Sequence, residues 1–411
     1  MYRHVKASHP STFHRALAQI AKYPNLANFV RTLDLSNACS STNFREPFKG
    51  FNPVRAALHR TPLVREFRIN EAMEQYLDFD ILQKLFSSSE FMETLDLSGC
   101  KSPRFVEGCR FLFEDNRAIS TSLKSLDLAG CSNLPPEFFE SLLPQLPQLQ
   151  HLNVSNTQIT STALSNIPPT ARLYHLNVSY CYVLDGKKVV DFLAYHSAVK
   201  QLAYLAMNTH PGIEHQIFSE EDVSKVLSNL PSTLRTLNFK NSAMTSAHAP
   251  LLHSISTRLG ELGVGSHLSF RDIENLFLNP ETLTDEETAP EILDEDDPRQ
   301  AEFKYKAILT PMEEAVAVCK LRQRISSVPF TPTSTKTSKL RYLDISGLPV
   351  SEQTKIQMSF LLGPQTMPLE IIEISEKGLG SCGVLPKLCA AVGWELKTLG
   401  RRCWMRRKVF E

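Results

Sequence analysis

The sequence predicts an α/β fold: a solenoid with a curved parallel sheet on its concave face and helical returns on its convex face. One nine-residue pattern recurs, as "METLDLSGC" (92–100), "LKSLDLAGC" (123–131) and "LYHLNVSYC" (173–181). Apolar residues occupy its positions 1, 4 and 6, and positions 3, 5 and 7 are small or polar. This alternation is typical of a strand with one buried face.

The spacing of the pattern identifies the type of repeat. Position 4 is taken by Leu95, Leu126, Leu152, Leu176 and Leu202, whose successive separations are 31, 26, 24 and 26 residues. This is the period of a leucine-rich repeat, in which stacked strands bury a continuous column of leucines. Further copies have Leu33, Leu237, Leu262, Leu343 and Ile372 at position 4, and weaker copies lie at 63–69 and 199–207. We therefore expect about ten strands.

The segments between the strands have helical spacing. "PEFFESLLPQLPQ" (136–148) and "VVDFLAYHSAV" (189–199) carry apolar residues three and four apart. Thr160 and Thr245 precede two such segments and are predicted helix N-caps.

Position 9 explains several of the nine cysteines, because Cys100, Cys131 and Cys181 occupy it, with Thr157 and Ser242 in other copies. A small side chain fits where the chain turns inward after a strand. We expect buried structural thiols, and a catalytic role remains the alternative. The start, "MYRHVKASHPSTFHRAL", has no apolar segment of a secretory signal, so free thiols in a reducing compartment are expected. Its basic residues leave a transit peptide open.

Composition excludes several classes of function. Forty-four basic and 44 acidic residues give zero net charge, so nothing global attracts nucleic acid or an anionic membrane. No apolar run approaches the roughly 20 residues of a membrane span. The "GLGSCG" segment (378–383) lacks the following βαβ unit and acid of a dinucleotide site. No paired Cys or His with ligand spacing, GxSxG or Walker lysine occurs, so we predict no cofactor, no metal and no enzyme activity.

The concave face is the predicted protein-binding surface. His151 and His175 share position 3 and should stand side by side, where a shared metal is the minor alternative. Exposed Tyr and His can anchor a protein partner. The opposing interpretation is that Asp or Asn at position 5 merely suits this repeat class. The candidate residues are Asp34, Asp96, Asp127, His151, Asn153, Tyr174, His175, Asn177, Tyr180, Asn238 and Lys240.

Two stretches interrupt the repeats. Residues 281–302 contain ten acids and one Arg, which predicts a flexible acidic loop, and a helix over 311–326 and a Pro/Ser/Thr linker over 327–338 follow. The basic, Trp-containing C-terminus is predicted to cap the solenoid, and nucleic-acid binding is the weaker alternative. The predicted organisation is a helical lead-in (1–29), repeats (30–280), the interruption (281–338), the last repeats (339–380) and a basic cap (381–411).

The cysteine-containing repeats resemble those of F-box substrate receptors. The start, "MYRHVKASHPSTFHRALAQIAKYPNLANFVRTLDLS", is similar to the segment that follows the F-box in fungal members, although no "LP.E.L..I" stretch precedes it. The resemblance implies the substrate-receptor part of an SCF-type ubiquitin ligase, with a protein substrate, a Skp adaptor and a cullin as partners, in the cytoplasm or nucleus. A scaffold or regulatory protein without a ubiquitin link is the alternative.

Overall fold

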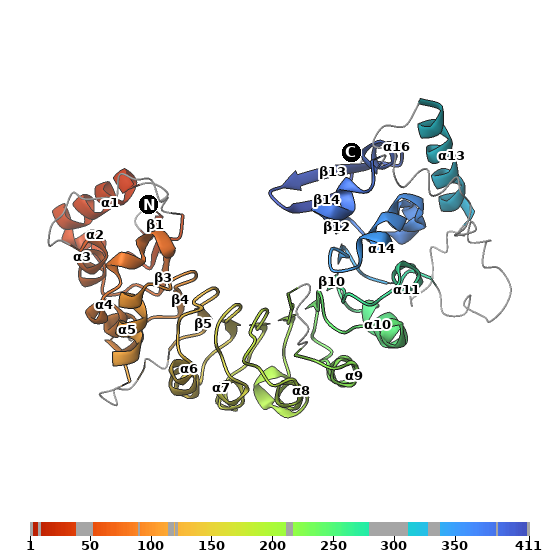
Figure 1. Ribbon diagram of the computed structural model, residues 1–411. Coiled ribbons are helices and arrows are strands. Elements are labelled where there is room, and N and C mark those ends of the chain that lie inside the picture. Colours follow the sequence, from red (N-terminus) through yellow and green to blue (C-terminus); the bar gives the residue numbers. More distant parts are fainter. Residues whose placement is uncertain are drawn as a thin grey trace. The chain divides into compact units, whose positions relative to one another are not determined.

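The computed structural model describes residues 3–6, 10–37, 52–88, 91–113, 119, 122–210, 217–278, 311–327, 338–383 and 385–408. Strands alternate with helices along these residues (Figure 1), so the chain is α/β as predicted. The chain forms two compact units. Unit 1 comprises Met1–Ala206 with Asn229–Thr233, and unit 2 comprises Met207–Ser228 with Leu234–Glu411.

The strands of unit 1 form a parallel sheet in which each strand pairs with the next along the chain. Its strands are β1 (His4–Lys6), β2 (Thr32–Leu35), β3 (Glu66–Ile69), β4 (Thr94–Asp96), β5 (Ser125–Asp127), β6 (His151–Asn153), β7 (His175–Asn177) and β8 (Tyr204–Ala206). The register places position 4 of one repeat opposite position 4 of the next, as in Leu126↔Leu152. Leu126 and Leu152 are buried, whereas the polar residues beside them on β5 and β6 are partly or fully exposed. The arrangement is open and solenoid-like, consistent with a leucine-rich-repeat fold.

The structure corrects one alignment. Leu205, and not Leu202, pairs with Leu176, so the last separation is 29 residues (205 − 176) rather than 26. Leu202 is buried as the position 1 residue, and because apolar residues fit both alignments, the sequence alone did not separate them. The correction places Tyr204 at position 3, opposite His175.

Helical returns connect the strands of unit 1 and lie along one side of the sheet (Figure 1). Thr160 caps α7 as predicted, because its hydroxyl accepts a hydrogen bond from the Ala163 N–H at 3.1 Å. The helices are α1 (Pro10–Lys22), α2 (Pro24–Ala27), α3 (Pro53–Arg60), η2 (Glu71–Tyr76), α4 (Phe79–Gln83), η3 (Lys84–Ser88), α5 (Pro103–Phe111), α6 (Pro136–Leu142), η4 (Leu143–Gln145), α7 (Ser161–Ser165), α8 (Gly186–Tyr195) and η5 (Ser197–Val199).

Unit 2 continues the same alternation and ends differently. Its parallel strands are β9 (Thr236–Asn238), β10 (Glu261–Gly263), β11 (Tyr342–Asp344) and β12 (Ile371–Ser375). The helices are α9 (Glu220–Asn229), η6 (Ser246–His248), α10 (Ala249–Ser256), α11 (Phe270–Asn275), α13 (Pro311–Ser327), α14 (Val350–Thr354), η8 (Lys355–Met358), η9 (Phe360–Leu362), η10 (Pro364–Thr366), α15 (Glu376–Gly380) and α16 (Leu385–Ala391). Thr245 occupies the N-cap position of η6.

The predicted acidic loop, 281–302, lies outside the described residues, as do residues 328–337 of the predicted linker. The helix predicted over 311–326 is α13. Its Leu321 is fully buried. The Arg324 guanidinium lies 3.5 Å from the largely buried Glu274 carboxylate of α11. The helix therefore packs against unit 2.

The basic C-terminus forms an antiparallel hairpin, β13 (Trp394–Leu399) and β14 (Arg402–Arg407), and β14 pairs with β12. The hairpin thus covers the edge of the last parallel strand. Arg407 donates to the carbonyls of Leu369 and Gly363, both at 2.9 Å, and burial lowers its pKa to about 10. Arg402 donates two hydrogen bonds to the Glu373 carboxylate, at 3.0 and 2.6 Å. These two arginines are engaged within the protein.

Within the described ranges, no helix is long and apolar enough to cross a membrane.

Candidate functional site

Seven Asp and Asn residues at position 5 share one structural contact in both units. In each case a side-chain oxygen accepts a hydrogen bond from the backbone N–H two residues later, the geometry of an Asx turn. The distances range from 2.9 Å at Asp127 to 3.3 Å at Asn153. The residues are Asp34, Asp96, Asp127, Asn153, Asn177, Asn238 and Asp344.

These turns give a physical reason for Asp or Asn at position 5, since their short side chains carry an oxygen that reaches the backbone two residues later more favourably than a hydroxyl does. The reason applies equally to Asp and to Asn, so the turns do not explain why some repeats carry a charge. In unit 1, position 5 carries a charged residue at Asp34, Asp96 and Asp127 and a neutral amide at Asn153 and Asn177.

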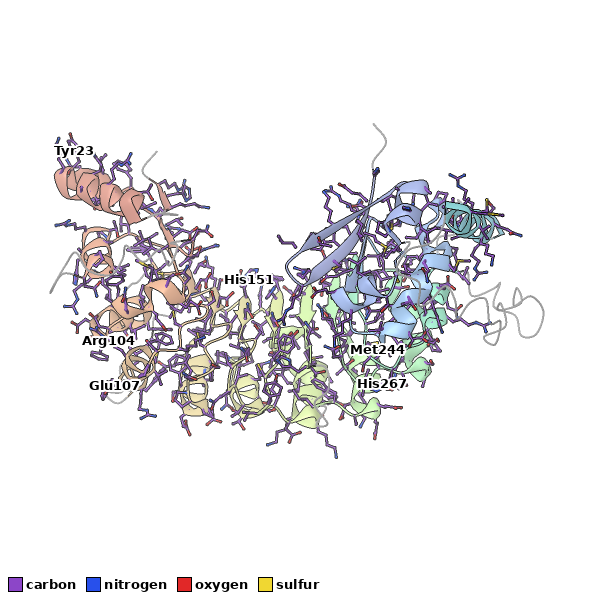
Figure 2. All side chains as sticks on the ribbon, turned by 45° about the horizontal axis from the view of Figure 1, so that its top comes forward. Tyr23, Arg104, Glu107, His151, Met244 and His267 are labelled. Carbon is purple, nitrogen blue, oxygen red and sulfur yellow. The ribbon has the colours of Figure 1, made fainter. Side chains whose placement is uncertain are left out.

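Position 3 of unit 1 carries a stack of rings. His151 and His175 lie side by side as predicted, with ring centroids 6.2 Å apart. The His175 ring lies flat on the Tyr204 ring, at 4.0 Å and 7°. Figure 2 shows His151 on the strand side of unit 1, away from the helices, and its side chain is exposed. We name these three residues the aromatic ladder.

His175, the central residue of the ladder, favours its neutral form. Burial of His175, helped by the nearby His151, lowers the pKa of the His175 imidazole below its ordinary 6.5. Tyr174 precedes His175 and is 37% exposed, so a further aromatic side chain lies in the same repeat. Neutral rings with exposed faces can stack against planar groups of a partner.

The lowered pKa of His175 predicts a pH dependence of stability. The unfolded chain takes up a proton near pH 6.5 before the folded chain does, so the free energy of unfolding decreases as the pH falls below about 6.5. Replacing His175 with Gln is expected to remove this component. Urea unfolding at pH 7.5 and pH 5.5 measures it, and an equal decrease in wild type and variant would contradict the assignment.

Tyr180 has an unusual backbone conformation. Position 8 has a positive φ in five repeats, and it is occupied there by Gly99, Gly130, Asn156, Tyr180 and Asn241. Gly and Asn tolerate this left-handed conformation, whereas a bulky aromatic residue rarely adopts it. The φ of 62° at Tyr180 therefore costs stability that its neighbours do not lose.

We expect the substitution Tyr180→Asn to stabilise unit 1 by about 1 kcal/mol, because it relieves this strain. The reverse change, Asn156→Tyr, is the matched control and should destabilise by a similar amount. Urea midpoints measure both. A loss of stability in Tyr180→Asn would mean that contacts of the tyrosine ring outweigh the strain.

The remaining candidates have specific partners. The Asp34 carboxylate is buried beside Ser36 and lies 3.8 Å from the Lys6 ammonium. Lys240, in unit 2, donates to Asp344 at 3.1 Å and to Ser346 at 2.9 Å. Its ammonium is therefore engaged in an internal ion pair. The sequence did not place Tyr204 beside His175, because Leu202 and Leu205 fit position 4 equally well and the alignment on Leu202 was chosen.

The position 9 thiols are structural. Cys131 donates to the Leu97 carbonyl and Cys181 to the Val154 carbonyl, at 3.2 and 3.0 Å. Burial raises the pKa of Cys131 to about 12 and that of Cys181 to about 11. Both therefore remain protonated at neutral pH, and a protonated thiol is a poor nucleophile.

Iodoacetamide at pH 8 is expected to modify the exposed Cys319 of the native protein while sparing Cys100, Cys131 and Cys181. Peptide mass spectrometry before and after denaturation measures this. Early modification of a position 9 thiol would show that the position is accessible.

The Gly378–Gly383 segment is a packing feature. A Cβ at Gly378 would lie 2.4 Å from the Gln353 Oε1, which accepts hydrogen bonds from the Ser375 N–H and hydroxyl. The glycine thus admits a buried amide. Among the described residues, no group of three or more His, Cys, Asp or Glu side chains is arranged to hold a metal ion.

Comparison with known proteins gives one relevant similarity. No protein-family model matches the chain. The chain is 27% identical over 152 residues to the F-box protein YLR352W of Saccharomyces cerevisiae. The match covers 33% of this chain and 19% of the yeast protein, so it spans about one fifth of that relative's length.

Proposed function

We propose that the chain recognises a protein partner without catalysing a reaction, and that it is the substrate-receptor part of an SCF-type ubiquitin ligase. The aromatic ladder on the strand side of unit 1 is the observation that carries the recognition role. The exposed His151 ring and the half-buried His175 and Tyr204 rings, held rigidly on a sheet, provide contact area with little loss of side-chain entropy on binding. The similarity to a yeast protein named as an F-box protein supports the ligase role.

The chemistry of the side chains also favours recognition. The position 9 thiols Cys131 and Cys181 donate to carbonyls, and the glycine-rich segment encloses Gln353. The groups that the sequence considered for a catalytic role or a dinucleotide site thus have structural contacts instead. The aromatic ladder, whose His151 ring is exposed, therefore supports the recognition role.

Affinity purification of the chain with a C-terminal tag from its native host, followed by mass spectrometry, tests the proposal. We expect a Skp adaptor, a cullin and one or more substrate proteins. The substitutions His175→Ala and Tyr204→Ala together should remove the substrate proteins and leave the adaptor and cullin. Tyr195→Ala is the control, because this tyrosine of helix α8 is 80% exposed in the same unit.

Three outcomes separate the possibilities. Stable partners without an adaptor or cullin would contradict the ligase role and favour a scaffold with no ubiquitin link. Substrate binding that survives the double substitution would contradict recognition by the ladder. If the Tyr195→Ala control lost the substrate proteins equally, the loss would not be specific to the aromatic ladder.

A further inference from the structure

The strand side of unit 1 carries unbalanced charge. We define the strand face as the position 3 and position 5 side chains of β3–β8. These are Glu66, Arg68, Thr94, Asp96, Ser125, Asp127, His151, Asn153, His175, Asn177, Tyr204 and Ala206. Among its carboxylates and guanidinium groups, three carboxylates stand against one guanidinium, a formal charge of −2 (−3 + 1). The face is therefore acidic at the β3–β5 end and aromatic at the β6–β8 end.

Arg68 lies opposite Asp96 on β3, and its charge acts on Asp127, but among the described residues no cation forms an ion pair with either of the two inner carboxylates. Asp96 and Asp127 lie opposite each other on β4 and β5, where like charges are unfavourable. Each uses one oxygen for its Asx turn, and the second oxygen of Asp127 accepts from the Asn153 amide at 2.9 Å. Neither carboxylate forms an ion pair within the part of the chain that the structure describes, and Arg68 lies 3.8 Å from Glu66.

Asp127 is also partly removed from water. Burial raises the pKa of its carboxyl, and the neighbouring Asp96 raises it further. A cation that arrived beside this pair would offset both effects, since an opposite charge favours the ionised form of a carboxylate. The Asx turns require only an oxygen, so the backbone does not account for the negative charge at these two positions.

The ladder begins one strand beyond the acids. His151, at position 3 of β6, pairs with Ser125, two residues from Asp127 on β5. Such diagonal neighbours lie within about 7–8 Å, which a long side chain spans. An arginine guanidinium can bond a carboxylate with its edge and stack on an aromatic ring with its face. The exposed His151 ring and the Asp96–Asp127 pair offer these two contacts together.

We propose that the strand face of unit 1 binds an extended partner segment through an arginine side chain, whose guanidinium bonds Asp96 and Asp127 with its edge and stacks with its face on the His151 ring of the aromatic ladder. This inference rests on the proposed recognition function and specifies the chemistry of the partner. Charge complementarity selects a cationic segment over an acidic one, and the planar rings select arginine over lysine.

An array of end-blocked synthetic heptapeptides, with Arg, Lys, Gln or Glu fixed at the central position and the other positions randomised, tests the inference on the full chain. We expect the Arg set to bind about tenfold more tightly than the Glu set, with Lys between them, and binding to weaken as NaCl is raised. Fluorescence anisotropy of the best peptide gives its Kd.

The matched variant is Asp96→Asn with Asp127→Asn. Asn153 and Asn177 form the same Asx turn in adjacent repeats, so the double variant should fold while it loses both charges. We expect its Arg-over-Glu preference to fall to less than about threefold. Glu261→Gln, which removes an exposed position 3 carboxylate from unit 2, should leave the preference unchanged.

The outcomes separate this inference from the proposed function. No peptide binding, equal binding of all four sets, or an Arg preference that survives in the double variant would overturn the inference. If substrate capture in the host still depended on His175 and Tyr204, the proposed function would stand without it. Loss of the Arg preference in the double variant, with unchanged urea stability, supports the inference.

Discussion

Replacing Trp394 with alanine is expected to lower the free energy of unfolding of unit 2 by about 3–5 kcal/mol. The indole is 1% exposed, and its Nε1–H donates to the Leu362 carbonyl at 2.7 Å. The Arg407 guanidinium lies 4.5 Å from the ring centroid. Truncation would leave a cavity, an unsatisfied carbonyl and a desolvated guanidinium without its aromatic partner.

The chain provides a matched control in its second tryptophan. Trp404 lies on β14 and is half-buried, and Arg402 lies 5.7 Å from its ring. Trp404→Ala should cost about 1–2 kcal/mol, because less surface is lost and no buried hydrogen bond is broken. Each single variant contains one tryptophan, so urea unfolding followed by fluorescence reports on the other. Equal losses in the two variants would contradict the role of Trp394 as the buried anchor of the C-terminal hairpin.

The ion pair between Lys240 and Asp344 is expected to show the second large effect. Lys240→Met should destabilise unit 2 by about 3 kcal/mol, because it leaves a buried carboxylate without its cation. The Asp344 side chain is 5% exposed, and Ser346 alone would then bond to it. The lysine crosses strand β10, whose Gly263 at position 5 has no side chain.

A double-mutant cycle separates the charge from the packing. Asp344→Asn keeps the oxygen of the Asx turn, as Asn238 does, and removes the negative charge. The double variant Lys240→Met with Asp344→Asn should therefore recover most of the stability lost in Lys240→Met. If the two single losses simply added, the pair would not be coupled, and the assignment would be wrong.

Much of unit 1 follows from the sequence because its information is local. A strand with apolar positions 4 and 6, a turn and a helical return are encoded within one repeat, and stacking repeats the same contacts. The burial of Cys131 and the neighbouring places of His151 and His175 follow from the repeat number alone. The same approach misaligned the repeat of β8, since Leu202 and Leu205 fit two registers equally well.

The sequence by itself determined the α/β class, the repeat, the buried thiols and the adjacency of the two histidines. Only the tertiary structure decided that Tyr204 completes the ladder, that Tyr180 has a left-handed backbone, and that Lys240 is engaged with Asp344. The physical reason is the range of each interaction. Periodic burial is determined by residues close together in the sequence. The ion pair between Lys240 and Asp344, which are 104 residues apart, depends on which strands lie next to each other and on the lack of a side chain at Gly263 between them.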